Sequence, residues 1–337
     1  MRSVVFWQEF AHVVINRLVN PEPGDPLLIV ADTATDMNLV QACFTAGIVA
    51  GADAHMIVQK RTHRDAGKEL GASLKGAILG SKLVLVLGGG IVRDPATLEA
   101  LEKGARILST VVNGIEDYCL RALLDVDIDA MNRNCKRVEE LWNKTKVCQV
   151  TSRQGTDLTY ELIPRKVKSE FGDGAITYDG EIDFFPGAQV NVAPVEETIN
   201  GVIVVDASDT HNRLVHTPYS LFVEDGIIQR VEGGPEADLI RNWMETIGAR
   251  DEKVYRLCHA SIGMNPAARI SGNLMEDERK LAALDFGFGF QYPELGGTVG
   301  HSLYHWDVIL STPTIYLDGK EMSGGGQLNP DMGFEAV

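Results

Sequence analysis

The first half of the chain alternates short apolar runs with segments whose apolar residues recur at helical spacing. The apolar runs, each of strand length, lie at residues 26–30, 54–58, 82–87 and 106–109. Helical patterns occupy residues 6–18, 36–50 and 95–102, and the first of them ends before Pro21 and Pro23. Strands that alternate with helices in this way predict an α/β domain, built on an open parallel sheet that helices cover.

The pattern changes near residue 150, after a charge-rich helical stretch at residues 129–147. Beyond it, short strands predominate and are bounded by turn signals such as Asp225-Gly226 and Asp318-Gly319. The strand-like segments lie at residues 202–206, 221–223, 227–231 and 314–317, and one helical pattern lies at residues 236–247. We therefore predict an α/β domain over residues 1–150 and a β-rich, α+β domain over residues 151–337.

The composition is typical of a folded two-domain chain and argues against two classes of partner. The length of 337 residues exceeds one ordinary hydrophobic core, and a content of 45% hydrophobic and 23% charged residues is globular. Lysine and arginine number 31 against 47 aspartates and glutamates, which gives a formal charge of −16. Such a surface repels nucleic-acid phosphates and anionic lipid headgroups, so we expect neither nucleic acid nor a membrane as a partner.

Other features of the sequence indicate the cytoplasm. No apolar run reaches the roughly 18 residues of a membrane span. Residues 1–20 lack the basic-then-apolar order of a signal peptide. The five cysteines are odd in number and form no Cys-x-x-Cys pair. We interpret them as reduced thiols of a cytoplasmic protein, most of them small core residues.

Histidines concentrate near the C-terminus. Three of the eight, His259, His301 and His305, lie in the last quarter, and Asp307 follows two residues after the last of them. Residues i and i+2 of a strand point to the same side, so His305 and Asp307 would direct an imidazole and a carboxylate at one point. Because apolar residues continue this strand, the polar pair is expected to be buried and to need a partner, which a metal ion would provide.

Ordered landmarks run through the second half of the chain. They are Gly155-Thr156-Asp157-Leu158, Pro186-Gly187-Ala188-Gln189, Ile262-Gly263-Met264-Asn265-Pro266, Glu276-Asp277-Glu278, His305-Trp306-Asp307 and Tyr316-Leu317-Asp318-Gly319. With these landmarks the chain resembles the metalloaminopeptidases of the aminopeptidase T and S type, and above all their relatives, the 2,5-dihydroxypyridine 5,6-dioxygenases. The resemblance implies a homo-oligomer with one catalytic site in the second half of each chain.

The resemblance also implies a set of metal ligands. In the peptidase branch, glutamates stand in the places of Gln189 and His259 and help to hold two metal ions. Two neighbouring divalent cations need anionic bridging ligands, which glutamine and imidazole cannot supply. The remaining set, His259, His305 and Asp307, matches the dioxygenase branch. Two imidazoles and one carboxylate with open coordination positions suit a mononuclear non-haem Fe(II) site that binds substrate and O2.

Asp285 and three further residues complete the expected site. Asp285 stands where the peptidase branch has a histidine, and could be a ligand of a second metal, a partner of an imidazole, a base or an uninvolved residue. His301 is a candidate proton donor or substrate contact, or else a plain loop histidine. Gln189 and Tyr292 are candidate substrate-binding residues, and Tyr292 matches the peptidase branch; the alternative for Tyr292 is a structural aromatic.

Arg93 is the candidate from the first half of the chain. It lies just past a predicted strand, where ligands of open α/β sheets bind. The dihydroxypyridine enzymes carry in the similar loop a histidine thought to act as a base. An arginine suits a carboxylate or phenolate group of a substrate better than it suits proton abstraction. A surface contact with Asp94 is the alternative.

These observations lead to one hypothesis and two rivals. We expect an Fe(II)-dependent, extradiol-type dioxygenase that opens the ring of a small hydroxylated N-heteroaromatic substrate, such as 2,5-dihydroxypyridine, with O2. The first rival is an aminopeptidase-like hydrolase with Zn or Co, in which Asp285 replaces part of the lost ligand charge. The second is a binding protein without catalytic activity, which would require the three ligand residues to be free of metal.

Overall fold

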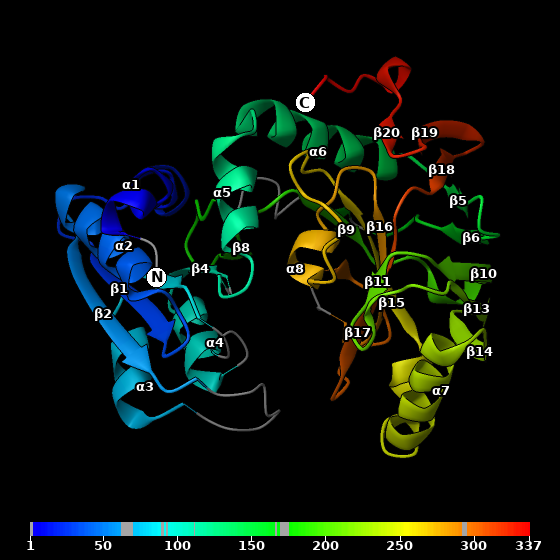
Figure 1. Ribbon diagram of the computed structural model, residues 1–337, viewed down its shortest axis with the longest axis horizontal. Coiled ribbons are helices and arrows are strands. Elements are labelled where there is room, and N and C mark those ends of the chain that lie inside the picture. Colours follow the sequence, from blue (N-terminus) through cyan, green and yellow to red (C-terminus); the bar gives the residue numbers. More distant parts are fainter. Residues whose placement is uncertain are drawn as a thin grey trace. The chain divides into compact units, whose positions relative to one another are not determined.

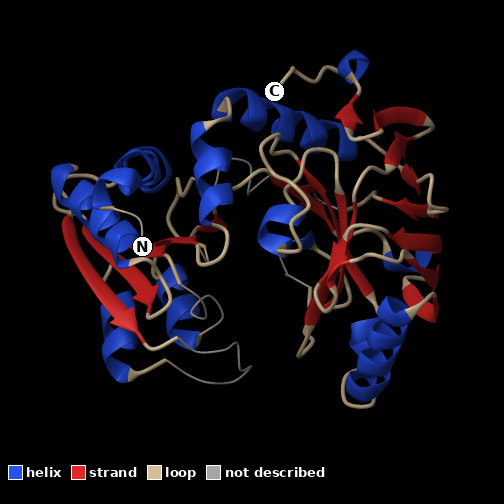
Figure 2. Cartoon of the chain, viewed as in Figure 1, coloured by secondary structure: helices blue, strands red, loops and turns tan. Residues whose placement is uncertain are grey.

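The computed structural model describes residues 3–61, 70–88, 91, 94–110, 112–165, 167–168, 175–291 and 295–337, so that Arg93 and Tyr292 lie outside the described residues. The chain divides into two compact units. The first comprises Met1–Asp125 and Asp173–Gly187, and the second comprises Val126–Gly172 and Ala188–Val337. Figures 1 and 2 show the helices and strands of each. Within the described ranges, no helix has both the length and the apolar character needed to cross a bilayer.

The first unit contains the predicted parallel sheet. Its five strands are ordered β2-β1-β3-β4-β8 and all pair in parallel. They are β1 (Pro26–Asp32), β2 (Asp53–Gln59), β3 (Leu83–Val86), β4 (Arg106–Ser109) and β8 (Ile182–Phe184). The helices are α1 (Val4–Val13), α2 (Met37–Val49), α3 (Ala72–Leu79), α4 (Pro95–Glu102) and α5 (Glu116–Leu124), with a π-helical turn at Val14–Val19. The expected α/β architecture is confirmed.

The central strands of this sheet are covered on both faces, whereas the edge strand β2 is largely exposed. Leu28 and Val30 of β1 belong to a cluster that includes Leu74 and Ile78 of α3. Leu27 points to the opposite face, because side chains alternate along a strand, and there it lies against Gly47 of α2. A sheet buried on both faces requires nearly continuous apolar strands, which is the pattern in the sequence.

The second unit contains two antiparallel sheets. The eight-stranded sheet has the order β14-β13-β10-β6-β5-β18-β19-β20. Its strands are β5 (Val147–Thr151), β6 (Asp157–Glu161), β10 (Asn200–Val205), β13 (Tyr219–Glu224), β14 (Ile227–Glu232), β18 (Thr314–Leu317), β19 (Lys320–Gly324) and β20 (Gln327–Leu328). The helices are α6 (Ile128–Trp142), α7 (Pro235–Gly248) and α8 (Leu274–Asp277). The second half of the chain is therefore rich in β-structure, as the sequence predicted.

The seven-stranded sheet has the order β12-β11-β17-β16-β15-β9-β7 and positions the candidate site. Its strands are β7 (Val167–Lys168), β9 (Gln189–Val192), β11 (Ser208–Asp209), β12 (Arg213–Leu214), β15 (Leu257–Gly263), β16 (Leu284–Gly289) and β17 (His305–Leu310). One face is aromatic: Phe288 stacks on Trp306 at 4.7 Å, and Phe286 meets Tyr160 of the other sheet edge-on at 6.3 Å. This face joins the two sheets.

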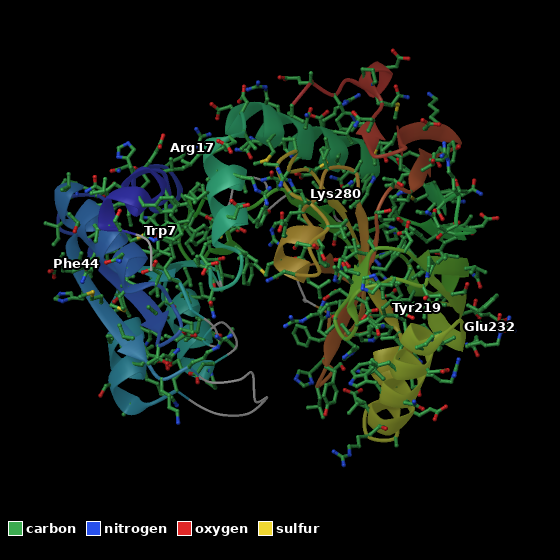
Figure 3. The ribbon with its side chains drawn as sticks, viewed as in Figure 1. Trp7, Arg17, Phe44, Tyr219, Glu232 and Lys280 are labelled. Atoms are coloured by element: carbon green, nitrogen blue, oxygen red, sulfur yellow. The ribbon has the colours of Figure 1, made fainter. Side chains whose placement is uncertain are left out.

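A buried, hydrogen-bonded aspartate holds strand β11, which pairs with β17 in this sheet. Asp209 is buried at the end of β11, and its carboxylate accepts hydrogen bonds from the backbone N–H groups of His211 and Asn212. The hydroxyl of Tyr219, which Figure 3 labels, donates to Asp209 Oδ2 at 3.0 Å. Since β11 pairs with β17 through Ser208 and Asp209, this network holds the strand that carries two of the candidate ligands.

The division into units differs from the predicted boundary at residue 150. Helix α6 belongs to the second unit, where Arg137 donates to the carbonyl of Met332 at 2.7 Å and Asn134 to that of Glu335 at 3.0 Å. Strand β8 belongs to the first unit and pairs with β4. Helical spacing does not reveal which sheet a helix packs on, and a strand of three residues is too short to give a pattern.

Candidate metal centre

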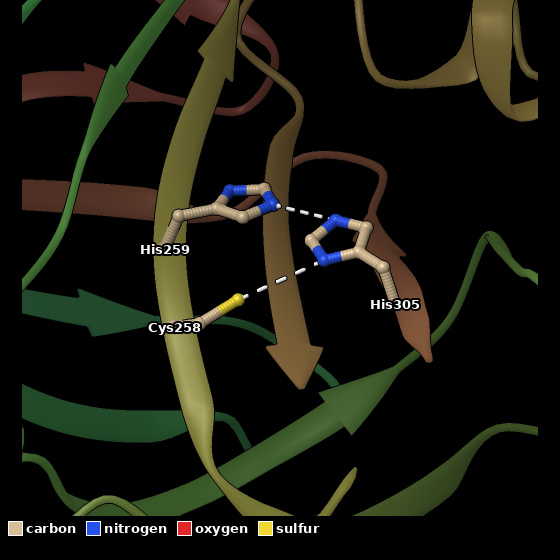
Figure 4. A group of neighbouring side chains, drawn as sticks. All are labelled: Cys258, His259 and His305. Atoms are coloured by element: carbon tan, nitrogen blue, oxygen red, sulfur yellow. Dashed lines mark hydrogen bonds between the residues drawn. The ribbon is translucent and has the colours of Figure 1, made fainter. Parts of the chain in front are cut away.

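Two imidazoles and one carboxylate converge on one face of the seven-stranded sheet. The Nε2 atoms of His259 on β15 and His305 on β17 are 3.2 Å apart. Asp307 Oδ1 lies 3.0 Å from His305 Nε2 and 3.4 Å from His259 Nε2. Figure 4 shows the two rings facing each other from neighbouring parts of the sheet, with Cys258 beside them. The structure thus brings together the three residues that the sequence proposed as ligands.

The register of three strands explains this convergence. Strand β16 lies between β15 and β17, and its Gly287 is opposite both His259 and Asp307. A Cβ atom at position 287 would lie 2.0 Å from His259 Nε2, closer than any real contact. The absence of a side chain at Gly287 therefore makes the space in which the His259 ring lies.

Hydrogen bonds on the far side of each ring orient its Nε2 atom. His305 Nδ1 lies 2.8 Å from the carbonyl oxygen of Phe290, which can only accept, so the proton stands on Nδ1. His259 Nδ1 lies 2.9 Å from the Ser261 hydroxyl. In both residues the nitrogen that faces the cluster is Nε2.

The charges of the cluster depend on one another. Burial lowers the pKa of His305, but the adjacent Asp307 carboxylate outweighs burial and holds this pKa well above its usual value. Burial raises the pKa of Asp307, but the imidazoles of His305 and His259 reverse this effect, and the pKa falls below its usual value. Positive charge is therefore stabilised next to the Asp307 carboxylate.

The donor set fits a metal ion. When the proton of His305 stands on Nδ1, its Nε2 directs a lone pair at the cluster, as do His259 Nε2 and Asp307 Oδ1. While both imidazoles carry their proton on Nδ1, the buried Asp307 Oδ1 has no hydrogen-bond donor among the described residues. A cation between the three atoms would compensate all three lone pairs. In the metal-free protein the raised pKa of His305 favours a second proton on its ring instead. Two further groups have ligand atoms within 4.8 Å of one another: Cys258, His259 and His305, and His259, Asp285 and Asp307.

Asp285 lies beside the cluster and is fully buried. Its Oδ2 is 4.0 Å from His259 Nδ1 and 3.5 Å from Gln189 Nε2, so this oxygen lies near the side of the imidazole that faces away from the other ligands. Burial, followed by the charges of Asp307 and Glu278, raises the pKa of Asp285 well above its usual value. In the metal-free protein these surroundings therefore favour the neutral form of Asp285.

Of the other predicted site residues, two lie within the described part of the chain. Gln189 is buried and contacts Asp285. His301 is exposed, and its ring meets Phe290 edge-on at 5.8 Å. Arg93 and Tyr292 lie outside the described residues.

Five residues in or next to this site were not predicted from the sequence. They are Gly287, Ser261, Asn191, Glu278 and Cys258. The Phe-Gly-Phe-Gly run at residues 286–289 was the available signal, since alternating glycines leave one face of a strand empty.

Comparisons with known proteins show the family of the chain. Residues 10–330 match the family model described as 2,5-dihydroxypyridine 5,6-dioxygenase. A 2,5-dihydroxypyridine 5,6-dioxygenase of Pseudomonas putida is 25% identical over 249 residues, which are 71% of this chain and 68% of the relative.

Two solved structures share the fold. The 2,5-dihydroxypyridine dioxygenase of Pseudomonas putida KT2440 has a TM-score of 0.80 at 21% identity, covering 98% of both chains. AmpT, the aminopeptidase T of Thermus thermophilus, has a TM-score of 0.67 at 18% identity, covering 96% of this chain and 98% of its own.

Gly287→Ala tests the arrangement of the strands. We expect the added methyl group to displace the His259 ring, to lower the free energy of unfolding by about 1–3 kcal/mol and to abolish stoichiometric metal binding. Metal content after equilibration with Fe(II), together with urea denaturation, measures both effects. Gly76→Ala on α3 is the control, because a Cβ there meets nothing within 4 Å, and this variant should retain its metal. A folded Gly287→Ala protein with full metal content would contradict the interpretation.

Proposed function

Because the chain belongs to the 2,5-dihydroxypyridine 5,6-dioxygenase family, we propose that it is a ring-cleaving dioxygenase that uses Fe(II) and O2 on a hydroxylated N-heteroaromatic substrate. One observation carries the proposal: Nε2 of His259, Nε2 of His305 and Oδ1 of Asp307 lie within 3.4 Å of one another. This is the donor set of a two-histidine, one-carboxylate iron site. The substrate that we propose is 2,5-dihydroxypyridine or a close analogue.

The three ligand residues would hold the iron from one side. Held by these residues, Fe(II) would supply open coordination positions and the redox chemistry that activates O2 beside the substrate. The protein keeps the ligands in place through the Nδ1 contacts of both imidazoles, with the Phe290 carbonyl and with Ser261. The aromatic face of the sheet lies on the opposite side and anchors these strands to the rest of the second unit.

We propose that Asp285 acts beside the metal and not as a ligand. It lies 4.0 Å from Nδ1 of His259, and its raised pKa favours the neutral form, which can donate a hydrogen bond. Gln189 Nε2, 3.5 Å from Asp285, is the adjacent polar group. Together they can hold or move a proton at a polar substituent of the substrate.

We also propose that the loop leading into β17 contacts the substrate. It carries Tyr292 and the exposed His301. Gln291 ties the described part of this loop to β15, because its side chain donates to the carbonyl of Cys258 at 2.6 Å and accepts from the backbone N–H of Val299 at 3.1 Å.

A hydrolase with Zn or Co is the second candidate. The group of His259, Asp285 and Asp307, with ligand atoms within 4.8 Å of one another, favours it, because Asp285 could then complete a second metal position. The two functions differ in metal content and in oxidant. One iron per chain and uptake of O2 with 2,5-dihydroxypyridine support the dioxygenase; two metals per chain and anaerobic hydrolysis of peptides support the hydrolase.

Removal of any one ligand should abolish activity together with metal binding. We expect anaerobically purified His259→Ala, His305→Ala and Asp307→Ala proteins to contain only background iron and to consume no O2 with 2,5-dihydroxypyridine. Each variant leaves only two of the three donor atoms that meet at 3.0–3.4 Å. Iron analysis and an oxygen electrode measure the two losses. Ser323→Ala, which truncates a buried side chain on β19, should retain both properties.

Asp285→Asn distinguishes a neutral acid from a ligand. Asparagine has nearly the shape of a protonated aspartate, so the variant should keep most of its iron and lose turnover. Iron per chain and kcat with 2,5-dihydroxypyridine are the measurements. An iron-free variant would make Asp285 a ligand and would favour the hydrolase.

Arg93→Ala tests the proposed role of the arginine after β3 in recognising an anionic substituent. A charge-assisted contact of about 1.5–3 kcal/mol corresponds to a rise in KM of roughly tenfold to a hundredfold. Arg93→His should instead favour 2,5-dihydroxypyridine over a more acidic analogue. Steady-state kinetics with both substrates decide the question, and unchanged constants in both variants would assign Arg93 to a surface contact.

A further inference from the structure

Two buried side chains behind His259 form a hydrogen-bonded pair across the sheet. Ser261 follows His259 by two residues on β15 and therefore faces the same side. Asn191 on β9 is opposite Ser261 in the strand register. Ser261 is fully buried, and Asn191 and His259 are each 8% exposed. Water therefore has little access to the hydrogen bonds that join them.

The direction of these hydrogen bonds determines which nitrogen of His259 carries its proton. Ser261 donates its single hydroxyl proton to Asn191 Oδ1 at 2.5 Å. Its oxygen can then only accept, so the contact of 2.9 Å with His259 Nδ1 requires a proton on Nδ1. The Nε2 lone pair of His259 is left free, and Nε2 is the atom that faces His305 and Asp307.

We propose that Asn191 and Ser261 are positioning residues that fix the tautomer and the ring orientation of His259 for metal binding. This inference rests on the proposed function only in taking His259 as a ligand. His305 receives the same support from a backbone carbonyl, which no substitution can remove. His259 depends on side chains, and without them its Nδ1 would face the Asp285 carboxyl group, whose Oδ2 is 4.0 Å away.

Two substitutions at Asn191 distinguish a hydrogen-bond acceptor from a residue that only fills space, because they should affect metal affinity differently. Aspartate at this position can only accept from Ser261 unless it is protonated, so Asn191→Asp imposes the proposed direction. It also removes Nδ2, a buried atom that has no hydrogen-bond partner among the described residues. Asn191→Leu keeps a similar volume and removes the acceptor.

Binding of Co(II) to metal-free, full-length protein at fixed pH is the first test. Ser261→Ala and Asn191→Leu should raise the Kd for Co(II) about tenfold to a hundredfold, as expected when a ligating histidine loses its hydrogen-bond partner. Asn191→Asp and Ser261→Thr should keep the Kd close to that of the unchanged protein. Ser323→Ala on β19 is the matched control for removal of a buried serine hydroxyl. Equal affinity in Ser261→Ala, or a loss of affinity in Asn191→Asp, would overturn the proposal.

The second test measures the tautomer of His259 directly. If Ser261 and Asn191 had a purely structural role, their substitution would not change this tautomer. In metal-free protein labelled with 15N-histidine, the signals of His259 are identified by their loss in His259→Gln. The neutral ring should carry its proton on Nδ1, and Ser261→Ala should shift the population toward the Nε2-protonated form. A ring protonated on Nε2 in the unchanged protein would overturn the proposal. Neither measurement uses substrate or O2, so a failure of the proposed reaction is distinguishable from a failure of this inference.

Discussion

Three lone pairs that meet on one face of a β-sheet require a positive charge between them. The arrangement of the neighbouring strands in the second unit depends on this electrostatic constraint. The Nε2 atoms of His259 and His305 and the Oδ1 atom of Asp307 are 3.0–3.4 Å apart and largely withdrawn from water. In the metal-free protein the requirement raises the pKa of His305 despite burial and lowers that of Asp307. A divalent cation meets the same requirement with two unit charges, so the features that perturb the pKa values also favour metal binding.

The neighbouring strands serve this cluster in different ways. Strand β16 contributes space at Gly287 between the two ligand strands, and β9 contributes the Asn191 acceptor behind Ser261. The face that carries the candidate ligands is polar, whereas the opposite face stacks Phe288 on Trp306 and packs against the other sheet. The same alternation of side chains that separates the two faces also aligns the donors, so stability and metal binding depend on one register.

The spacing of apolar residues in the sequence predicted those features that depend on residues close together in the chain. The parallel sheet followed from apolar runs between helical segments, and the shared direction of His305 and Asp307 followed from their spacing of two in an apolar strand. The approach of His259 to them depends on cross-strand register, which no local pattern contains; for this residue the prediction rested on family resemblance. Ser261 and Asn191 were missed for the same reason, whereas Gly287 stands in the alternating glycine run at residues 286–289, which was a local signal. The domain boundary differed because the partners of α6 and β8 are distant in the chain.

The most direct measurement is anomalous diffraction at the iron edge from crystals of the protein loaded anaerobically with Fe(II). The account predicts one iron per chain, bonded to Nε2 of His259, Nε2 of His305 and an oxygen of Asp307, with Asp285 outside bonding distance. Two metal ions per chain, or an iron bonded to Asp285 in place of one of the three ligands, would contradict it.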